Sequence, residues 1–271
     1  MADCNSCPSK GKCGSKSESC GVKNNPLNKV KKIIGVMSGK GGVGKSTISA
    51  VLARTLHKKG YSVGLMDADI TGPSAVRLMG LQGERAYGDG KGNILPAETK
   101  DGIKVMSLNL MMEDENQPVV WRGAMLSNCV QQFWSETLWG ELDYLVIDMP
   151  PGTGDVTLTV MQSIPLSGIV LVSLPQDMVG MIVTKSLNMA RMLNIPVYGV
   201  VQNMSYVKCP HCGEKISIYG GDTSSLVLEQ GIPLLGELPT NADLAAMSQG
   251  KTKISDKEVL EVFEALAKTV E

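Results

Sequence analysis

Short apolar runs alternate with amphipathic stretches along most of the chain. Residues 46–59 place Ile48, Leu52 and Leu56 on one helical face, and Gly60, a residue that favours a helix end, follows them. Residues 178–193 and 256–270 also have helical spacing. The apolar runs around these segments are residues 33–37, 62–66, 103–108, 144–148, 169–174, 197–201 and 233–238. Such continuous, often β-branched runs are typical of strands covered on both faces, so the alternation predicts an α/β fold with a doubly wound, mostly parallel sheet.

The first 25 residues differ from the rest of the chain, because they contain almost no apolar side chains and are rich in Ser, Lys, Gly and Cys. Such a segment cannot bury enough surface to offset the entropy of ordering. We therefore expect a flexible, cysteine-rich arm over residues 1–25 and one α/β domain over residues 26–271. Within the domain, the glycine-rich stretch at residues 83–101 predicts a surface hairpin or loop insertion.

Composition narrows the range of partners and compartments. The net charge of −1 does not favour broad attraction to nucleic acid or to an anionic membrane, so neither is an expected partner. No apolar run approaches the ~20 residues that span a bilayer, and the start of the chain lacks the hydrophobic segment of a signal peptide. We expect a cytoplasmic protein. In a reducing compartment, clustered cysteines indicate metal sites more strongly than disulfides.

A phosphate-binding motif follows the first apolar run. It fits the pattern G-x-x-x-x-G-K-[ST] and leads into the first predicted helix. Its residues are Gly39, Lys40, Gly41, Gly42, Val43, Gly44, Lys45 and Ser46. Glycines allow backbone N–H groups to turn toward phosphate oxygens, and the helix N-terminus adds its positive end. The motif predicts that Lys45 neutralises the β- and γ-phosphates of a nucleotide, most simply ATP, that Ser46 binds Mg²⁺, and that Thr47 adds a phosphate hydrogen bond.

Carboxylates at strand ends complete the predicted nucleotide site. Asp148 ends the apolar run at residues 144–148, and Asp67 and Asp69 follow the run at residues 62–66. Because the carboxyl ends of parallel strands meet at one edge of a sheet, these side chains are expected beside the phosphate loop. There they would hold Mg²⁺ or its waters and orient the attacking water. The N–H of Gly152, in the loop after Asp148, is a candidate contact for the γ-phosphate.

Several longer motifs connect the chain with a known family. They are GKGGVGKS (39–46), DADITGPS (67–74), VVWRGAM (119–125), DYLVIDMPPGTGD (143–155), VQNMSYVKCPHCG (201–213) and LPTNADL (238–244). The first, with Lys40 directly after its first glycine, resembles the deviant Walker A motif of the MinD/ParA-like ATPases. Within that superfamily the chain resembles the Mrp/ApbC branch, which comprises scaffold and carrier ATPases of iron–sulfur cluster assembly. The resemblance covers nearly the whole chain, and Ala124, where the branch usually has proline, departs from it.

The resemblance implies a homodimer that encloses two ATP molecules. Lys40 would reach the partner's nucleotide and stabilise the charge of the transferred phosphate, so we assign a catalytic role to Lys40 and to Asp69, which would position water. Asp67 would contribute to the Mg²⁺ shell, and Asp148 would act as the Walker B carboxylate. The resemblance also implies that Asn203 hydrogen-bonds adenine and that Pro239 flanks the base.

Cys209 and Cys212 form a knuckle in the sequence CPHCG, in which two thiolates at this spacing can grip one ion. One pair cannot complete a site of four thiolates, but two copies related by a twofold axis can. The family resemblance implies that the pair bridges a [4Fe–4S] cluster between subunits. Zinc is the alternative, because tetrahedral thiolate sites suit both. His211, between the thiolates, is expected to be a loop residue.

A second group of cysteines crowds the N-terminal arm. Cys4, Cys7, Cys13 and Cys20 could hold a second cluster by themselves, whereas zinc or redox roles remain open. Related eukaryotic scaffolds place their fourth cysteine far upstream, which leaves the ligand set open. Cys129 and methionines such as Met189 and Met192 are expected to fill the core.

These features predict an ATP-binding, slowly hydrolysing carrier that assembles a [4Fe–4S] cluster and transfers it to apo iron–sulfur proteins. The partner subunit would be an identical chain or, in a heterodimer, a related ATPase. Two alternatives remain. A positioning or partition ATPase would need a basic face or tail, and an electron-transfer ATPase resembling nitrogenase reductase would also bridge a cluster across a dimer.

Overall fold

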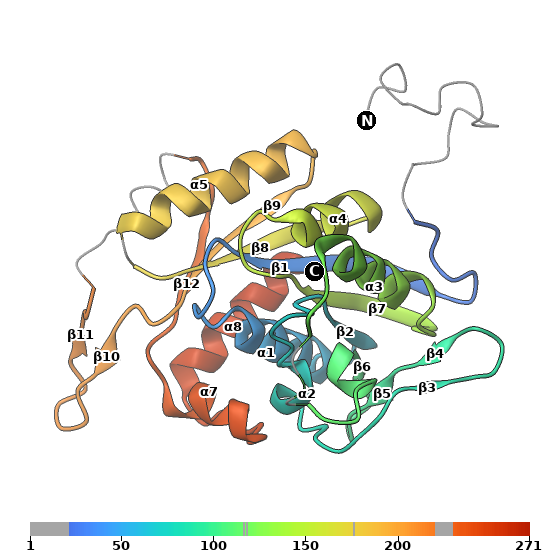
Figure 1. Cartoon of the computed structure of the whole chain (residues 1–271). Coiled ribbons are helices and arrows are strands. Elements are labelled where there is room, and N and C mark those ends of the chain that lie inside the picture. Colours follow the sequence, from blue (N-terminus) through green and yellow to red (C-terminus); the bar gives the residue numbers. More distant parts are fainter. Residues whose placement is uncertain (1–21, 116, 118, 176, 220–229) are drawn as a thin grey trace.

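Figure 1 presents a computed structural model of the chain, which describes residues 22–115, 117, 119–175, 177–219 and 230–271 and, for residues 177–182, the backbone alone. The central element is an eight-stranded sheet with the strand order β12-β9-β8-β1-β7-β2-β6-β5. Its strands are β1 (Lys29–Ser38), β2 (Val63–Asp67), β5 (Ala97–Glu98), β6 (Lys104–Met106), β7 (Glu141–Asp148), β8 (Gly168–Ser173), β9 (Val197–Gln202) and β12 (Leu234–Glu237). All pairings are parallel except that of β5 with β6. The predicted doubly wound, mostly parallel sheet is confirmed.

Helices cover both faces of this sheet, as Figure 1 shows, with α3, α4 and α5 on one side and α1 and α8 on the other. The α-helices are α1 (Lys45–Lys58), α2 (Ala75–Leu78), α3 (Gly123–Ser135), α4 (Asp155–Ser163), α5 (Asp177–Met192), α7 (Ala242–Ala246) and α8 (Lys257–Val270). Short 3₁₀ turns lie at Leu108–Leu110 and Met247–Gln249. Among the described helices, none is long and apolar enough to cross a membrane.

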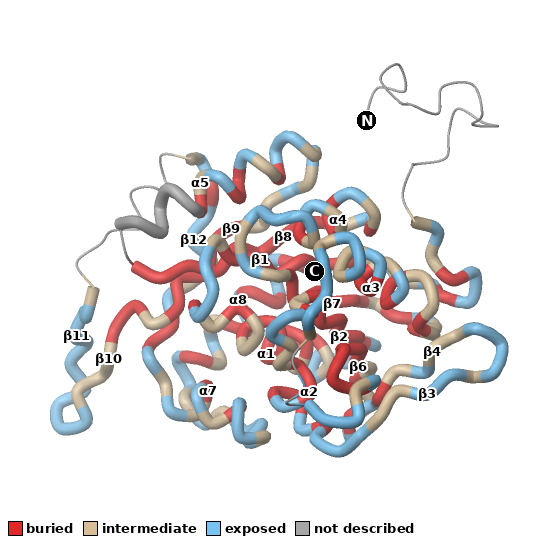
Figure 2. The backbone as a smooth tube through the Cα atoms, in the orientation of Figure 1, coloured by how far each residue is buried: buried red, intermediate tan, exposed pale blue. Residues whose placement is uncertain are grey.

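The core lies between the sheet and these two helical layers. Strands β2 and β8 are buried along their whole length, and the last six residues of β1 are buried as well. Figure 2 shows this continuous buried centre. The uninterrupted apolar runs of the sequence follow from burial on both faces, and the predicted strand positions agree with the observed ones to within a few residues.

Three residues that were predicted to fill the core differ in their burial. Cys129 on α3 is 7% exposed, and Met189 packs against the core, as expected. Met192, at the last position of α5, is 82% exposed, so its placement in the core was wrong. The position has helical spacing, but α5 ends there and the chain turns away through Asn194, which has a positive φ of 55°. Spacing alone does not show where a helix leaves the surface that it covers.

Two small antiparallel hairpins project from the sheet domain. The hairpin of β3 (Tyr87–Gly88) and β4 (Ile94–Leu95) confirms the prediction for residues 83–101, although β5 in the same stretch joins the main sheet. The second hairpin consists of β10 (Val207–Lys208) and β11 (Lys215–Ile216) and was not foreseen. It carries the CPHCG knuckle away from the body, and Figure 2 shows it as largely exposed.

The described residues that precede β1 contact the body of the domain. The indole N–H of Trp134 on α3 donates to the Val22 carbonyl at 3.2 Å. Asn25 is buried, and its side-chain amide donates to the side-chain oxygen Oδ1 of Asn93 at 2.7 Å. The chain therefore enters β1 from a fixed position beside α3 and the β3–β4 hairpin.

Strand β1 occupies the position that makes a nucleotide site possible. It lies between β7 and β8, where connections lead to opposite sides of the sheet. At such a switch point the loops diverge and leave a crevice at the carboxyl ends of the strands. The phosphate loop at residues 39–44 leaves β1 at this crevice and enters α1.

Candidate functional site

The phosphate loop has the backbone of an anion cradle. Gly42 and Gly44 have φ values of 79° and 83°, in the left-handed region that glycine adopts without strain. Gly44 is the N-cap of α1, and no side-chain cap of this helix is present among the described residues. The first N–H groups of α1 therefore remain available to an anion, and the helix dipole favours negative charge there. The backbone fits a polyphosphate.

The Asn203 side chain packs directly against this loop. Its Nδ2 atom donates to the Val43 carbonyl at 2.8 Å, and a Cβ atom at Gly44 would overlap the same amide nitrogen. Asn203 directly follows β9, and Leu238, which exchanges backbone hydrogen bonds with Gln202 and Ser205, brings the buried Pro239 to the same strand end. The two residues predicted to contact the base thus lie together beside the loop.

Lys45 lies in an almost fully buried ion pair. Its Nζ is 2.7 Å from Oδ1 of Asp148 at the end of β7, and the two side chains are 6% and 2% exposed. The Ser49 hydroxyl, one turn further along α1, donates to the same Asp148 oxygen at 2.9 Å. Within the described part of the chain, the other carboxylate oxygen, Oδ2, is buried without a hydrogen-bond partner. Such an atom indicates room for a further ligand, such as Mg²⁺ or one of its waters.

Asp69 lies farther from the lysine. Its Oδ2 atom is 3.9 Å from the Lys45 Nζ, and the side chain is 15% exposed. The Thr71 hydroxyl donates to its Oδ1 at 3.4 Å. Burial raises the pKa of Asp69 above its ordinary value, more than the nearby Lys45 lowers it. A carboxyl at this edge, still reachable from solvent, suits the positioning of a water molecule.

Asp67 is held in place by its hydrogen bonds. One carboxylate oxygen accepts the backbone N–H groups of Ser74 and Ala75 at 3.0 and 3.1 Å, and the Ser107 hydroxyl at 3.2 Å. Burial and the neighbouring Asp148 raise the pKa of Asp67 to about 7. Lys45 thus faces three carboxylates at this point, and the surplus of negative charge fits a divalent cation.

The remaining predicted residues of the nucleotide site are Lys40, Ser46, Thr47 and Gly152. Lys40 is exposed, so its contact with a partner's nucleotide stays a prediction. Ser46 and Thr47 are half-buried in the first turn of α1, beside Lys45. The Gly152 N–H donates to the Ser38 carbonyl at 2.7 Å, so in this conformation it is not free for the γ-phosphate.

Two residues of the site escaped the sequence analysis. Ser49 lies four positions after Lys45, and helical periodicity could have placed both on the face toward β7. Ser107 directly follows β6, the neighbour of β2, so its position at a strand end was the available signal. Each hydroxyl donates a hydrogen bond to a carboxylate of the site, Ser49 to Asp148 and Ser107 to Asp67.

The cysteine pair lies in a tight turn at the end of the β10–β11 hairpin. The Cys209 N–H donates to the Glu214 carbonyl, and the Gly213 N–H donates back to the Cys209 carbonyl, each at 2.9 Å. Cys209 is half-buried, whereas Cys212 and His211 are exposed. Hydrogen bonds from the backbone N–H groups of Cys212 and His211 lower the pKa of the Cys209 thiol, which favours the thiolate that a metal requires.

One chain does not offer a complete set of metal ligands at the knuckle. Among the described residues, no group of three or more His, Cys, Asp or Glu side chains is arranged to hold a metal ion. The predicted N-terminal ligands Cys4, Cys7, Cys13 and Cys20 lie outside the described residues. A site of four thiolates at the knuckle would therefore need further ligands from another molecule or from residues 1–21.

Comparison with known proteins assigns the chain to a family. The sequence model of the ParA family, described as NUBPL iron-transfer P-loop NTPase, matches residues 29–271. The chain belongs to this family. Among its relatives in the family, the iron–sulfur cluster carrier protein of Clostridium perfringens is 48% identical over 268 residues, covering 93% of this chain and 94% of the relative. The carrier protein of Methanocaldococcus jannaschii is 43% identical and covers 87% of this chain and 83% of its own length.

Solved structures agree with the family assignment. A nucleotide-binding protein of Archaeoglobus fulgidus in complex with ADP matches with a TM-score of 0.75 and 38% identity, over 86% of this chain and 92% of that one. The cell-division ATPase MinD of Pyrococcus furiosus matches with a TM-score of 0.62 at 19% identity, over 88% of this chain and 98% of that one, and shows the shared fold alone. This member of the iron-transfer P-loop NTPases is an ATPase built on the MinD-type sheet.

Proposed function

We propose that the protein is an ATP-dependent iron–sulfur cluster carrier, which holds a [4Fe–4S] cluster on Cys209 and Cys212 of two copies and passes it to apo-proteins. The observation that carries the proposal is the pairing of two sites in one chain. A glycine-rich loop leads from the main sheet into the uncapped N-terminus of α1, and two free thiols at a spacing suited to a shared metal lie on an exposed hairpin. Relatives named as carriers support the same conclusion.

Nucleotide binding would rearrange the ion pair at the centre of the phosphate site. Lys45 is held by Asp148 at 2.7 Å, and phosphate oxygens would take the place of this carboxylate at the ammonium group. Asp148 and Asp67 would then be available to Mg²⁺ and its waters, with Ser46 as a direct ligand. The cation would neutralise charge on the β- and γ-phosphates. Asp69 would orient the attacking water, and Asn203 would release Val43 to bind adenine.

The cargo would be held between two copies of the chain. Two knuckles related by a twofold axis supply the four thiolates that a [4Fe–4S] cluster takes. The apolar side chains of Ile216 and Ile218, which follow the knuckle, are 50% and 58% exposed, and a second copy would cover them. In such a dimer Lys40, exposed in the single chain, would reach the partner's nucleotide. Hydrolysis would be slow, because it serves to switch the dimer between states.

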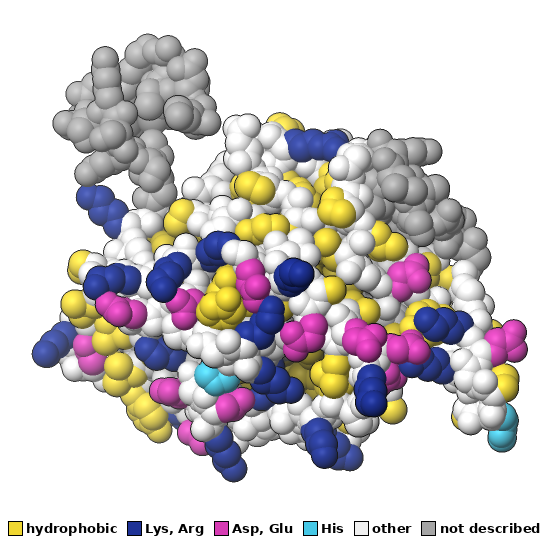
Figure 3. All heavy atoms as spheres, turned by 180° about the vertical axis from the view of Figure 1, so that it is seen from behind, with side chains coloured by type: hydrophobic (Ala, Val, Ile, Leu, Met, Phe, Trp, Pro, Cys, Tyr) yellow, Lys and Arg dark blue, Asp and Glu magenta, His cyan; other side chains and the backbone are white. Residues whose placement is uncertain are grey.

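The alternative functions of this fold, on DNA or on a membrane, find less support. On the face shown in Figure 3, basic and acidic side chains are intermixed, and no broad basic area would hold DNA there. The C-terminal helix α8 contains more acidic than basic residues, which does not suit a membrane anchor. Free thiols at an exposed turn fit the reducing cytosol, where we place the protein.

Metal analysis of anaerobically purified protein tests the proposal. Wild type should contain iron and acid-labile sulfide, with about two irons per chain at the knuckle, because one cluster of four irons is shared by two chains. The variant Cys209→Ala/Cys212→Ala should lose this iron while ATP affinity stays unchanged. The variant with Cys4, Cys7, Cys13 and Cys20 all replaced by Ala is the matched control and should keep it. Wild-type cluster should also pass to an apo-protein in the presence of a chelator.

Three outcomes would overturn the proposal. The first is zinc alone in wild type and in both variants. The second is full iron and sulfide in the knuckle variant together with loss in the arm variant. The third is a protein that stays monomeric under every nucleotide and metal condition, because neither the shared cluster nor the trans-acting Lys40 could then operate.

A further inference from the structure

The hairpin that carries the knuckle is too small to hold its own shape. Each of its strands, β10 and β11, has two residues, joined by two register pairs. A two-stranded hairpin is marginally stable in water, even when it is longer. Cys212 and the rest of the turn are exposed, so no core packing fixes them. Some other contact must position the two sulfurs before a cluster binds.

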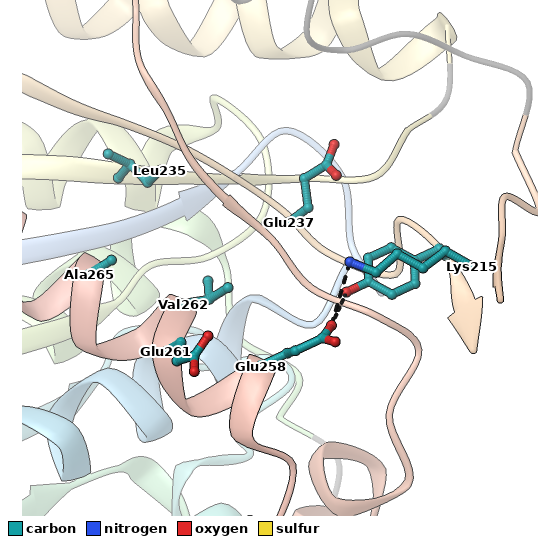
Figure 4. Close-up of a pocket in the computed structure, with 8 residues that line it drawn as sticks. Lys215, Leu235, Glu237, Glu258, Glu261, Val262 and Ala265 are labelled. Atoms are coloured by element: carbon teal, nitrogen blue, oxygen red, sulfur yellow. Dashed lines mark hydrogen bonds and ion pairs between the residues drawn. The ribbon is translucent and has the colours of Figure 1, made fainter. Parts of the chain in front are cut away.

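One carboxylate on the C-terminal helix meets both strands of the hairpin. Oε2 of Glu258 accepts the Tyr206 hydroxyl at 3.1 Å and lies 3.1 Å from the Lys208 Nζ and 3.5 Å from the Lys215 Nζ. Tyr206 and Lys208 precede Cys209, and Lys215 follows Cys212. Figure 4 shows the Lys215 ammonium and the Glu258 carboxylate directed at each other beside the hairpin. The contacts therefore close around the base of the knuckle from both sides.

Neighbouring contacts hold the same three donors in position. Lys215 lies over the Tyr206 ring, with its Nζ 4.5 Å from the centroid, a cation–π arrangement. Lys208 also pairs with Asp256, the N-cap residue of α8, at 3.2 Å. The amide of Asn241 donates to the same Asp256 carboxylate at 3.1 Å. The network ties the hairpin to the start of a helix whose apolar side is in the core.

We propose that Glu258 is a positioning residue for the cysteine knuckle, which fixes the hairpin base so that both thiolates are presented together to the shared cluster. The inference rests on the proposed function for the role of the thiolates, and on the structure for the contacts. Holding ligands in their bound arrangement beforehand reduces the entropy lost on binding. Each exposed ion pair is weak alone, but three donors converge on one oxygen.

The same helix offers a matched control in Glu261. It is one turn further along α8 and lines the same pocket of about 330 Å³, together with Glu258, Lys215 and Tyr206. Figure 4 shows Glu261 and Glu258 on adjacent turns. Within the described part of the chain, no hydrogen bond or ion pair connects Glu261 with the hairpin. The change Glu261→Gln removes the same charge without touching the proposed contacts.

Hydrogen exchange on the cluster-free protein tests the positioning step by itself. In Glu258→Gln, exchange in residues 206–216 should speed up by about fivefold, the effect of losing a few weak contacts that act together. The Cys209 amide, which donates to Glu214, is the most direct reporter. Glu261→Gln should leave these rates unchanged, and high salt should make wild type resemble Glu258→Gln by screening the pairs. Equal rates in wild type and Glu258→Gln would overturn the inference.

Cluster retention tests the consequence for function. Loss of iron to an external chelator should be about fivefold faster in Glu258→Gln than in wild type or Glu261→Gln, with the rate of ATP hydrolysis unchanged. Lys215→Gln removes one of the three contacts to Glu258 and the cation–π contact with Tyr206, so it should also speed the loss of iron. The double variant should lose iron more slowly than two independent effects would predict, because both changes remove the Glu258–Lys215 pair. An unchanged loss rate would overturn the inference. If wild type holds no knuckle cluster at all, the proposed function fails, whereas the exchange result still decides the positioning role.

Discussion

The phosphate site and the cysteine knuckle are built in opposite ways. At the phosphate site, Lys45 and Asp148 are nearly fully buried, stand on elements of an eight-stranded sheet domain, and pair at 2.7 Å. The knuckle stands on a hairpin with two residues in each strand, exposed on its turn, and is tied down by charged contacts to α8. One site is part of the core, and the other is attached to it.

The difference follows from what each site must do. Phosphate chemistry needs donors and carboxylates held rigidly in a dry crevice, where electrostatic contacts are strong. Under the proposed function, a second copy, the cluster donor and the client must all reach the carried cluster, so the thiols proposed to hold it have to be exposed. Substitutions at the buried site should therefore strongly affect ATP affinity and the stability of the fold. Equivalent substitutions at the knuckle should affect the stability of the fold only slightly.

The largest effect is expected for Lys45→Ala. Loss of the buried ammonium would remove the predicted phosphate contact and leave Asp148 without its charged partner, so ATP affinity should fall by more than about a hundredfold. Titration calorimetry with ATP measures this. Lys40→Ala, which changes an exposed lysine of the same loop, should keep ATP affinity and lose hydrolysis. Undiminished affinity in Lys45→Ala would contradict the assignment of the phosphate site.

Two glycines with similar backbones allow a direct comparison of the regions. Gly44 and Gly213 have φ values of 83° and 75°, so alanine costs about 1 kcal/mol of backbone strain at either position. At Gly44 the new Cβ would also overlap the Asn203 amide, whereas at Gly213 it would meet nothing within 4 Å. Gly44→Ala should therefore lower ATP affinity at least about tenfold and shift the urea midpoint further than Gly213→Ala. Equal losses of stability would show that the crowding at Gly44 has no effect.

A further expected effect is a pH dependence of stability that arises at the buried site. Folding raises the pKa of Asp67 from 3.8 to about 7, so between these values the folded, nucleotide-free protein binds the proton that the unfolded chain has lost. The free energy of unfolding should therefore fall as the pH rises from about 4 to about 7. Urea denaturation at about pH 5 and about pH 8 should show a weaker fall for Asp67→Asn. An identical fall in variant and wild type would contradict the raised pKa.

Much of the secondary structure and the position of the phosphate loop could be predicted from local patterns in the sequence. The positions of most strands in the main sheet and of α1, α5 and α8 followed from apolar runs and periodicity, because burial on one or two faces leaves a period in the sequence, whereas α4 was not predicted. The loop at residues 39–46 was predictable because a phosphate cradle needs glycine, lysine and a hydroxyl at fixed spacing. Asp67 and Asp148 were predictable as site members, because parallel strands deliver their carboxyl ends to one edge. The structure places them there, and the Mg²⁺ and water-positioning roles stay predictions.

Only the tertiary structure decided the contacts between segments far apart in the chain. Asn203 reaches the Val43 carbonyl across 160 positions, Ser49 reaches Asp148 across 99, and Tyr206 reaches Glu258 across 52. No spacing rule connects such residues, because their proximity depends on which strands are neighbours and where a surface helix ends. The chemistry of the loop and the knuckle is therefore local, whereas their support comes from the fold.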